Sequence, residues 1–327
     1  MSNTEVAPDE VACGAEPLAT VSTEVLHPRD VPLGGPRAIR VRRTLPQRDR
    51  SMIGAWCFAD HYGPHAVTGG AGMDVPPHPH TGLQTVSWLF AGEIEHRDSG
   101  GVHAMVRPGE LNLMTAGSGI CHSEVSTPNT TMLHGAQLWV ALPDADRNTA
   151  RDFAHYVPPA RTLGEATVRV FLGELAGDRS PVATFTPLLG AQIDLPANAS
   201  VTLDVDPSFE HGVLLDQGDL RAGGDDLGIG DLWYQSPGCD RVELTNRGDT
   251  PARALLLGGP PFEEELVMWW NFVGRTHDEI EAFRAQWQDQ DERFGEVTGY
   301  PGTRLPAPSL PNGRLRPRHN PTQRGAP

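Results

Sequence analysis

The sequence has no lysine, so all 26 of its fixed positive side chains are arginines. The 327 residues also include 42 aspartates and glutamates, which gives a formal net charge of −16 at pH 7. A field of this sign repels polyanions such as DNA. Direct binding to nucleic acid is therefore disfavoured as the main activity.

Cysteines and long apolar runs are also scarce. The four cysteines are widely spaced and form no C-x-x-C pair, which argues against a zinc knuckle or a disulfide framework. Nowhere do about 18 apolar residues follow one another, and residues 1–5 lack the basic and apolar regions of a secretory signal. We therefore expect a cytoplasmic protein with no membrane span.

Turn-forming residues are abundant, with 36 glycines and 30 prolines. Between about residues 37 and 260 they separate short apolar or alternating runs such as Thr85–Phe90, Gln137–Val140, Val168–Leu172 and Val201–Val205. Many short strands divided by turns indicate an all-β fold of the sandwich or barrel type. The Pro158-Pro159 link divides the strands into two predicted domains, 37–158 and 163–260.

The remaining segments differ from these two domains. A helical segment is predicted over 262–290, because Thr276 and Glu279 form a candidate capping box and Ile280, Phe283 and Trp287 share one helical face. We expect that face to pack on a β-domain. Residues 1–20, which are small and acidic, and residues 298–327, which are rich in proline and arginine, are both predicted to be disordered tails.

Histidines are concentrated in the first predicted domain, which holds eight of the 13 between His61 and His134. Two patterns stand out there: His78-Pro79-His80 and His122-Ser123-Glu124. On a β-strand, residues i and i+2 point to the same side of the sheet. Inside a barrel the two pairs can converge as three imidazoles and one carboxylate around a single divalent metal ion.

Such a ligand set suits Fe(II), Mn(II), Ni(II), Cu(II) or Zn(II), and it leaves positions open for substrate on a five- or six-coordinate ion. We interpret the other histidines of this domain as structural or surface groups, with His96 and His103 near the site but not ligands. Cys121 is expected to point away from the ion on an extended strand. The sequence has neither a phosphate-binding loop nor a dinucleotide fingerprint after a strand.

These residues resemble the pirins, which are two-domain members of the cupin superfamily, over about residues 37–290. The resemblance rests on five segments: Phe58–Pro64, His78–Val86, Pro108–Glu110, Met114–Glu124 and His134–Trp139. It implies two cupin-type β-barrel or sandwich domains with a C-terminal helix. It also implies one divalent ion, most typically Fe(II), held by His78, His80, His122 and Glu124.

Two features qualify this resemblance. Gln84 stands where many pirins have a glutamate, which changes the charge around the site but leaves the ligand set intact. The second predicted domain has a single histidine, His211, and no H-x-H pair, so it is similar to the metal-free cupin half of pirins.

Two functions of different classes follow from the resemblance. The first is a dioxygenase that opens quercetin-like flavonols or related phenols with O2 and loss of CO, with Glu124 as the catalytic base. The second is an iron-dependent interaction protein or transcriptional co-regulator that binds a protein partner. A zinc-dependent hydrolase or isomerase with the same ligands is a third option. A monomer is expected in each case.

Overall fold

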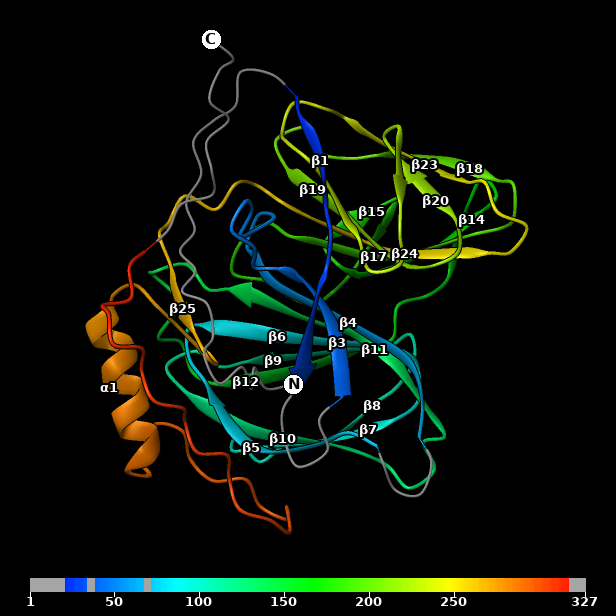
Figure 1. Cartoon of the computed structure of the whole chain (residues 1–327). Helices are drawn as coiled ribbons and strands as arrows, with labels where there is room; N and C mark the ends of the chain where they lie inside the picture. Colours follow the sequence, from blue (N-terminus) through cyan, green and yellow to red (C-terminus); the bar gives the residue numbers. More distant parts are fainter. Residues whose placement is uncertain (1–20, 34–38, 68–71, 318–327) are drawn as a thin grey trace.

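The computed structural model describes residues 21–33, 39–67 and 72–317, which form two β-sandwiches and one helix (Figure 1). The N-terminal domain packs a seven-stranded sheet against a four-stranded one. The large sheet has the order β12 (Asp152–Tyr156), β9 (Leu111–Thr115), β6 (Leu83–Ala91), β11 (Met132–Ala141), β4 (Trp56–Ala66), β3 (Ile39–Leu45), β2 (Arg29–Leu33). The small sheet has the order β5 (Asp74–His80), β10 (Ile120–Ser126), β7 (Ile94–Asp98), β8 (His103–Val106).

The C-terminal domain repeats this arrangement of seven and four antiparallel strands. Its large sheet has the order β1 (Thr23–Leu26), β22 (Leu232–Gln235), β19 (Glu210–Gln217), β24 (Ala252–Gly259), β17 (Leu189–Leu195), β14 (Ala166–Leu172), β13 (Arg161–Leu163). Its small sheet has the order β18 (Ser200–Asp204), β23 (Arg241–Asn246), β20 (Leu220–Ala222), β21 (Asp225–Leu227). A short hairpin, β15 (Glu174–Leu175) and β16 (Asp178–Arg179), lies beside it. The predicted all-β fold of two similar domains with a C-terminal helix is confirmed.

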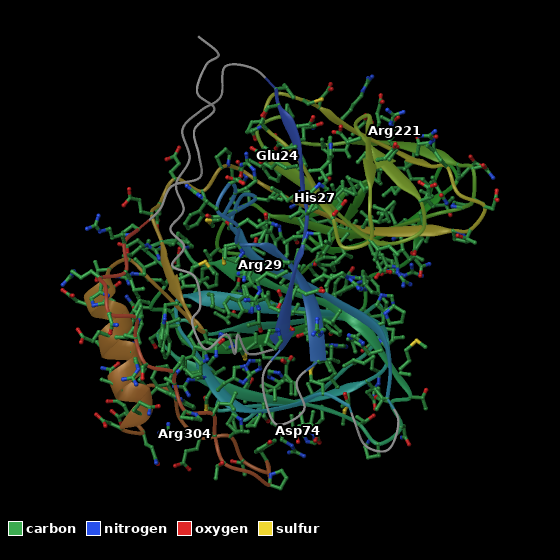
Figure 2. The ribbon with its side chains drawn as sticks, viewed as in Figure 1. Glu24, His27, Arg29, Asp74, Arg221 and Arg304 are labelled. Atoms are coloured by element: carbon green, nitrogen blue, oxygen red, sulfur yellow. The ribbon has the colours of Figure 1, made fainter. Side chains whose placement is uncertain are left out.

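The N-terminal segment crosses between the domains and gives one strand to each. The segment before residue 34 supplies β1 to the C-terminal sheet, paired with β22, and β2 to the N-terminal sheet, paired with β3. Figure 2 shows Glu24 and His27 on this segment where it passes from one domain to the other. The sequence prediction started the first domain at residue 37 and so left out both strands.

The two large sheets pack against each other through their outer faces. Leu138 and Trp88 from the N-terminal domain share one buried cluster with Leu214, Leu255 and Leu257 from the C-terminal domain. The inner faces of the same strands line the interior of each sandwich, so both faces are buried. This is why β24 is a continuous apolar run rather than an alternating one.

The segment after the second domain turns back onto the first. Its hairpin, β25 (Val267–Trp269) and β26 (Phe272–Gly274), is joined to the N-terminal domain where Val273 N–H donates to the carbonyl of Thr81 (3.1 Å). Gly82 must be glycine there, because its φ is +68° and a Cβ would lie 2.5 Å from the carbonyl oxygen of Val273.

The predicted helix is α1 (His277–Gln288), and Figure 1 shows it beside the N-terminal domain. Thr276 is its N-cap and accepts from Glu279 N–H, as the capping pattern predicts. Ile280 and Trp287 are buried in one apolar cluster with Phe272 of the hairpin and Cys121 of β10. With 12 residues, this helix of the described part is too short to cross a membrane.

The prediction of a disordered tail from residue 298 is wrong for 298–317. This segment has no helix or strand, but Leu305 N–H donates to the carbonyl of Pro77 (2.9 Å), and the Leu305 carbonyl accepts from Trp287 Nε1 (2.8 Å). Arg304, labelled in Figure 2, lies 4.2 Å from the centre of the Trp287 ring. Proline prevents regular structure here, yet aromatic and hydrogen-bonding contacts fix the segment. Residues 1–20 and 318–327 lie outside the described ranges.

Candidate metal centre

Two adjacent strands of the small N-terminal sheet carry the four predicted ligands. His78 and His80 lie on β5, and His122 and Glu124 lie on β10, with His122 directly opposite His78. The i, i+2 spacing turns each pair toward the interior of the sandwich. All four residues are fully buried, with 0% of their surface exposed.

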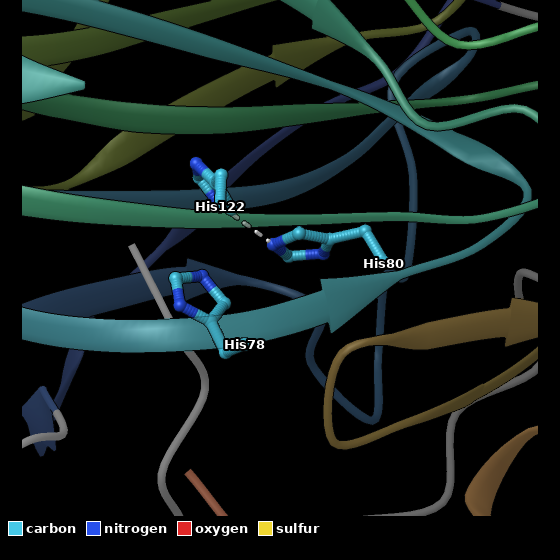
Figure 3. A group of neighbouring side chains, drawn as sticks. All are labelled: His78, His80 and His122. Carbon is cyan, nitrogen blue, oxygen red and sulfur yellow. Dashed lines mark hydrogen bonds between the residues drawn. The ribbon is translucent and has the colours of Figure 1, made fainter. Parts of the chain in front are cut away.

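The three imidazoles converge at one point (Figure 3). His80 Nε2 and His122 Nε2 are 3.1 Å apart, and the rings of His78 and His122 have centroids 4.3 Å apart. His78 Nδ1 makes a hydrogen bond to the carbonyl of Pro76 (2.8 Å), so this nitrogen carries the proton. Its Nε2 then has a free lone pair and, within the described part of the chain, no hydrogen-bond partner.

Burial keeps these rings uncharged. It lowers the pKa of His78 to about 3, and it lowers the pKa values of His80 and His122 well below the usual histidine range. The neighbouring imidazoles lower the last two further, because each would repel a second positive charge. Neutral imidazoles are the form that binds metal ions.

The donor set fits a divalent transition metal. Metal–nitrogen bonds of about 2.1 Å place neighbouring imidazole nitrogens about 3 Å apart, which is the spacing of His80 Nε2 and His122 Nε2. A third imidazole with a buried lone pair without a partner lies beside them. Together, His78, His80 and His122 can hold a cation that satisfies all three lone pairs.

Glu124 lies at the edge of this group. The pairing of β10 with β5 shifts register between His122 and Glu124, because three steps on β5 oppose two on β10, whereas the pairing with β7 is regular and puts Glu124 opposite His96. A carboxylate oxygen lies within 4.8 Å of ring nitrogens of His122 and His96, and Oε1 accepts from the hydroxyl of Ser87 (3.2 Å). The four predicted ligands therefore lie in one buried region. His122 belongs both to the group with His78 and His80 and to the group with His96 and Glu124.

The facing large sheet forms the other wall. Trp139 meets the His80 ring edge to face at 5.2 Å and stacks on Phe58 at 4.0 Å. Beside them, Arg43 and Asp60 form a fully buried ion pair with nitrogen–oxygen distances of 2.7 and 2.8 Å. This wall combines aromatic surface with a buried pair of charged groups.

Sequence reasoning did not identify Ser87 and Gln137. They face each other across β6 and β11, and their side chains are 2.9 Å apart, with Ser87 also reaching Glu124. Ser87 follows the first histidine motif on β6 and Gln137 follows the second on β11, but neither residue belongs to a motif. The available signal was that each is a polar residue within a strand that is mostly apolar.

The remaining sequence predictions around the site have mixed outcomes. His96 does lie beside the site, with Nδ1 3.3 Å from His122 Nδ1, whereas His103 is exposed and pairs with Glu95. Cys121 points away, because its Sγ donates to the carbonyl of Gly295 (3.3 Å). Gln84 donates to Thr115 Oγ1 (2.9 Å).

A second buried histidine cluster lies between the domains, and its role was not foreseen. His61 Nε2 and His134 Nε2 each lie 2.6 Å from Asp216 Oδ1, and Arg253 lies 2.6 Å from Oδ2. Arg42 Nε–H donates to His61 Nδ1 (3.1 Å), so the proton of His61 is on Nε2 and no lone pair is left there for a metal. The cluster joins the two domains by charge and hydrogen bonds.

The C-terminal domain offers no equivalent ligands. Its strands β18 and β23 take the places of β5 and β10 in the sheet order. Their inward residues are Val201, Leu203, Val242 and Leu244, which pack in the interior of that sandwich. Aliphatic side chains cannot bind a metal ion, and His211, on β19, is the single histidine of residues 163–260.

Comparison with known proteins gives a consistent picture. The family model described as Pirin matches residues 38–140, and the model described as Pirin C-terminal cupin domain matches residues 190–295. A Pseudomonas aeruginosa protein named "Putative quercetin 2,3-dioxygenase" is 44% identical over 284 residues, which cover 86% of this chain and 89% of that protein. A pirin-like protein of Caulobacter vibrioides is 35% identical over 257 residues, covering 76% and 88%.

Solved structures agree with the sequence comparison. The crystal structure of a quercetin 2,3-dioxygenase from Acinetobacter baumannii is 39% identical, with a TM-score of 0.85, and covers 90% of this chain and 97% of that one. The first match covers most of the N-terminal sandwich, including the histidine cluster, and the second covers most of the C-terminal sandwich and the segment that follows it through α1. The chain therefore belongs to the pirin family and consists of two cupin domains.

Proposed function

We propose that this protein is a metal-dependent dioxygenase that acts on quercetin-like flavonols or related phenols. The observation that carries the proposal is the convergence of three buried, neutral imidazoles on one point, beside a buried carboxylate. The names of two relatives, each a quercetin 2,3-dioxygenase or named as one, support the substrate class.

The ligands are His78, His80, His122 and Glu124, and the ion is Fe(II). An Fe(II) ion supplies Lewis acidity toward a phenolic oxygen and a source of electrons for O2. The protein keeps the imidazoles neutral by burial, and it fixes the His78 tautomer through Pro76. The cytoplasmic location and the monomeric state stay predictions.

Glu124 is the catalytic base. Its Oε1 atom already accepts one hydrogen bond, from Ser87, and the hydroxyl of a substrate that reaches this carboxylate can transfer its proton there. The aromatic pair of Trp139 and Phe58 gives a flat ring a surface to pack against. Deprotonation raises the electron density of the phenol, which its reaction with O2 requires.

The test measures O2 consumption and CO release with quercetin, using protein reconstituted with Fe(II) under anaerobic conditions. We expect turnover that depends on the metal and falls at least 100-fold in Glu124→Gln, a variant that keeps the shape but not the base, on the order of a general-base contribution. Glu95→Gln is the matched control, because Glu95 lies on neighbouring β7 and pairs with Arg97 and His103 outside the site.

Loss of activity in Glu124→Gln with the metal still bound supports the assignment of the base. An iron-loaded wild-type protein without turnover on quercetin or related catechols would refute the dioxygenase proposal. That result would favour the alternative of an iron-dependent protein that binds a partner. Metal analysis of the anaerobically purified protein separates both from a zinc enzyme.

A further inference from the structure

A chain of three buried side chains leads away from the proposed metal centre. His122 Nδ1 lies 3.3 Å from His96 Nδ1, and His96 Nε2 lies 3.1 Å from Asp98 Oδ2. Strands β10 and β7 place these residues together, since His122 is opposite Asp98 in their register. None of the three is more than 4% exposed.

Hydrogen-bonding rules fix the protons along this chain. A neutral imidazole has one N–H donor and one acceptor nitrogen. His122 Nε2 faces His80 Nε2 and must keep its lone pair to bind a metal, so Nδ1 of His122 carries the proton and donates. His96 therefore accepts at Nδ1 and donates from Nε2 to the carboxylate of Asp98.

Asp98 is itself held in place by the backbone. Its second oxygen, Oδ1, accepts from Gly100 N–H (2.7 Å) and Val102 N–H (3.1 Å) in the turn between β7 and β8. The carboxylate cannot rotate without breaking these bonds. Its Oδ2 is therefore a fixed acceptor that selects one tautomer of His96.

We propose that His96 and Asp98 are positioning residues that orient His122 for metal binding. The inference rests on the proposed metal site, and it goes beyond the four ligands because neither residue belongs to that set. Asp98 fixes the tautomer of His96, and His96 then holds the N–H of His122 so that the opposite nitrogen faces the ion. Such partners of ligating histidines typically contribute 10- to 100-fold in metal affinity.

Two substitutions of His96 separate this role from simple packing. Asparagine places its Oδ1 where histidine has Nδ1, so His96→Asn keeps the acceptor for His122 but loses the ring. Phenylalanine keeps a ring beside Phe153, which is 5.0 Å from the His96 ring, but has no acceptor. Both variants break the contact to Asp98 equally, so they form a matched pair.

The experiment measures the dissociation constant of Ni²⁺ by competition with a chromophoric chelator, without substrate or turnover. We expect His96→Phe to weaken binding by tenfold or more and His96→Asn to stay within about threefold of wild type. Circular dichroism and thermal unfolding confirm that each variant is folded. Glu95→Gln, on the outward face of the same strand, is expected to bind as wild type does.

Asp98→Asn tests the contact between Asp98 and His96 without changing either histidine. Its Oδ1 can still accept from Gly100 and Val102, but its amide N–H would face the N–H of His96. His96 would then take the other tautomer and present an N–H to His122, so Ni²⁺ affinity should fall several-fold. In a His96→Asn background the same change should have no further effect, because the link is already absent.

Three outcomes would overturn the proposal. These are wild-type affinity in His96→Phe, an equal loss in His96→Asn and His96→Phe, or an Asp98→Asn effect that persists in the His96→Asn background. The dioxygenase proposal fails separately, by lack of turnover in protein that has bound its metal. Failure of the wild-type protein to bind Ni²⁺ would remove the metal site on which both proposals depend.

Discussion

The lone histidine of the C-terminal domain gives a quantitative test of how burial acts in this fold. His211 lies on β19 with 0% of its surface exposed, and neither ring nitrogen has a hydrogen-bond partner in the described residues. Burial lowers its pKa from 6.5 to about 4, although Asp206 acts in the opposite direction. We predict that His211→Leu removes the part of the acid sensitivity of folding that comes from this one imidazole.

The sign and size follow from proton linkage. Because the pKa is lower in the folded protein, the unfolded chain binds the proton first as the pH falls below 6.5. The stabilisation is therefore complete above that pH and is lost progressively down to about pH 4. The full loss is about 3 kcal/mol, of which about 2 kcal/mol falls between pH 7 and pH 5.

The assay is urea unfolding followed by circular dichroism at pH 7, 6 and 5, without added metal. The free energy of unfolding should fall between pH 7 and pH 5 by about 2 kcal/mol less in His211→Leu than in wild type. His103→Leu, which removes an exposed imidazole, should differ from wild type by less than about 0.5 kcal/mol. If the free energy of unfolding changes with pH equally in wild type and His211→Leu, burial does not lower the pKa of His211.

Three further predictions test the interface, the C-terminal segment and the metal centre. Asp216→Asn should lower the free energy of unfolding by about 3 kcal/mol at pH 7, since Asp216 pairs with His61 and Arg253. Equal melting temperatures of the variant and the wild type would contradict this prediction. Hydrogen bonds and charge from these partners outweigh burial and hold the pKa of Asp216 well below its usual range, so the stabilisation is present above about pH 4 and declines in stronger acid. Truncation after residue 297 should lower the melting temperature by several degrees, because Leu315 and its neighbours leave an apolar cluster, whereas a disordered tail would leave it unchanged. His78→Ala should weaken Ni²⁺ binding at least 100-fold in the chelator assay, and wild-type affinity would exclude His78 as a ligand.

Local patterns in the sequence were enough to predict many of the strands and the helix, although not β1 and β2. Period-two alternation and turn residues mark the strands, and the capping pair of Thr276 and Glu279 marks the start of α1. The same period explains why His78-Pro79-His80 could be interpreted as a ligand pair without a structure. Both histidines of that motif must point to one side of β5, whatever the strand packs against.

The partners of that motif depend on the tertiary structure. Ser87 and His96 reach the site from other strands, and a residue's own neighbours in sequence carry no information about which strand faces it across a sandwich. The cluster of His61, His134 and Asp216 is a clearer case, because its members come from different domains. Only the packing of the two large sheets brings them together.

The sequence by itself therefore determined the fold class, the two-domain division, the family resemblance and the pairs of candidate ligands, because each depends on residues close together in the chain. The tertiary structure alone decided that β1 joins the second domain and that residues 298–317 pack on the first. It also decided that Asp98 and His96 stand behind His122. These arrangements depend on burial and hydrogen bonds between distant segments, which are settled only when the whole chain is packed.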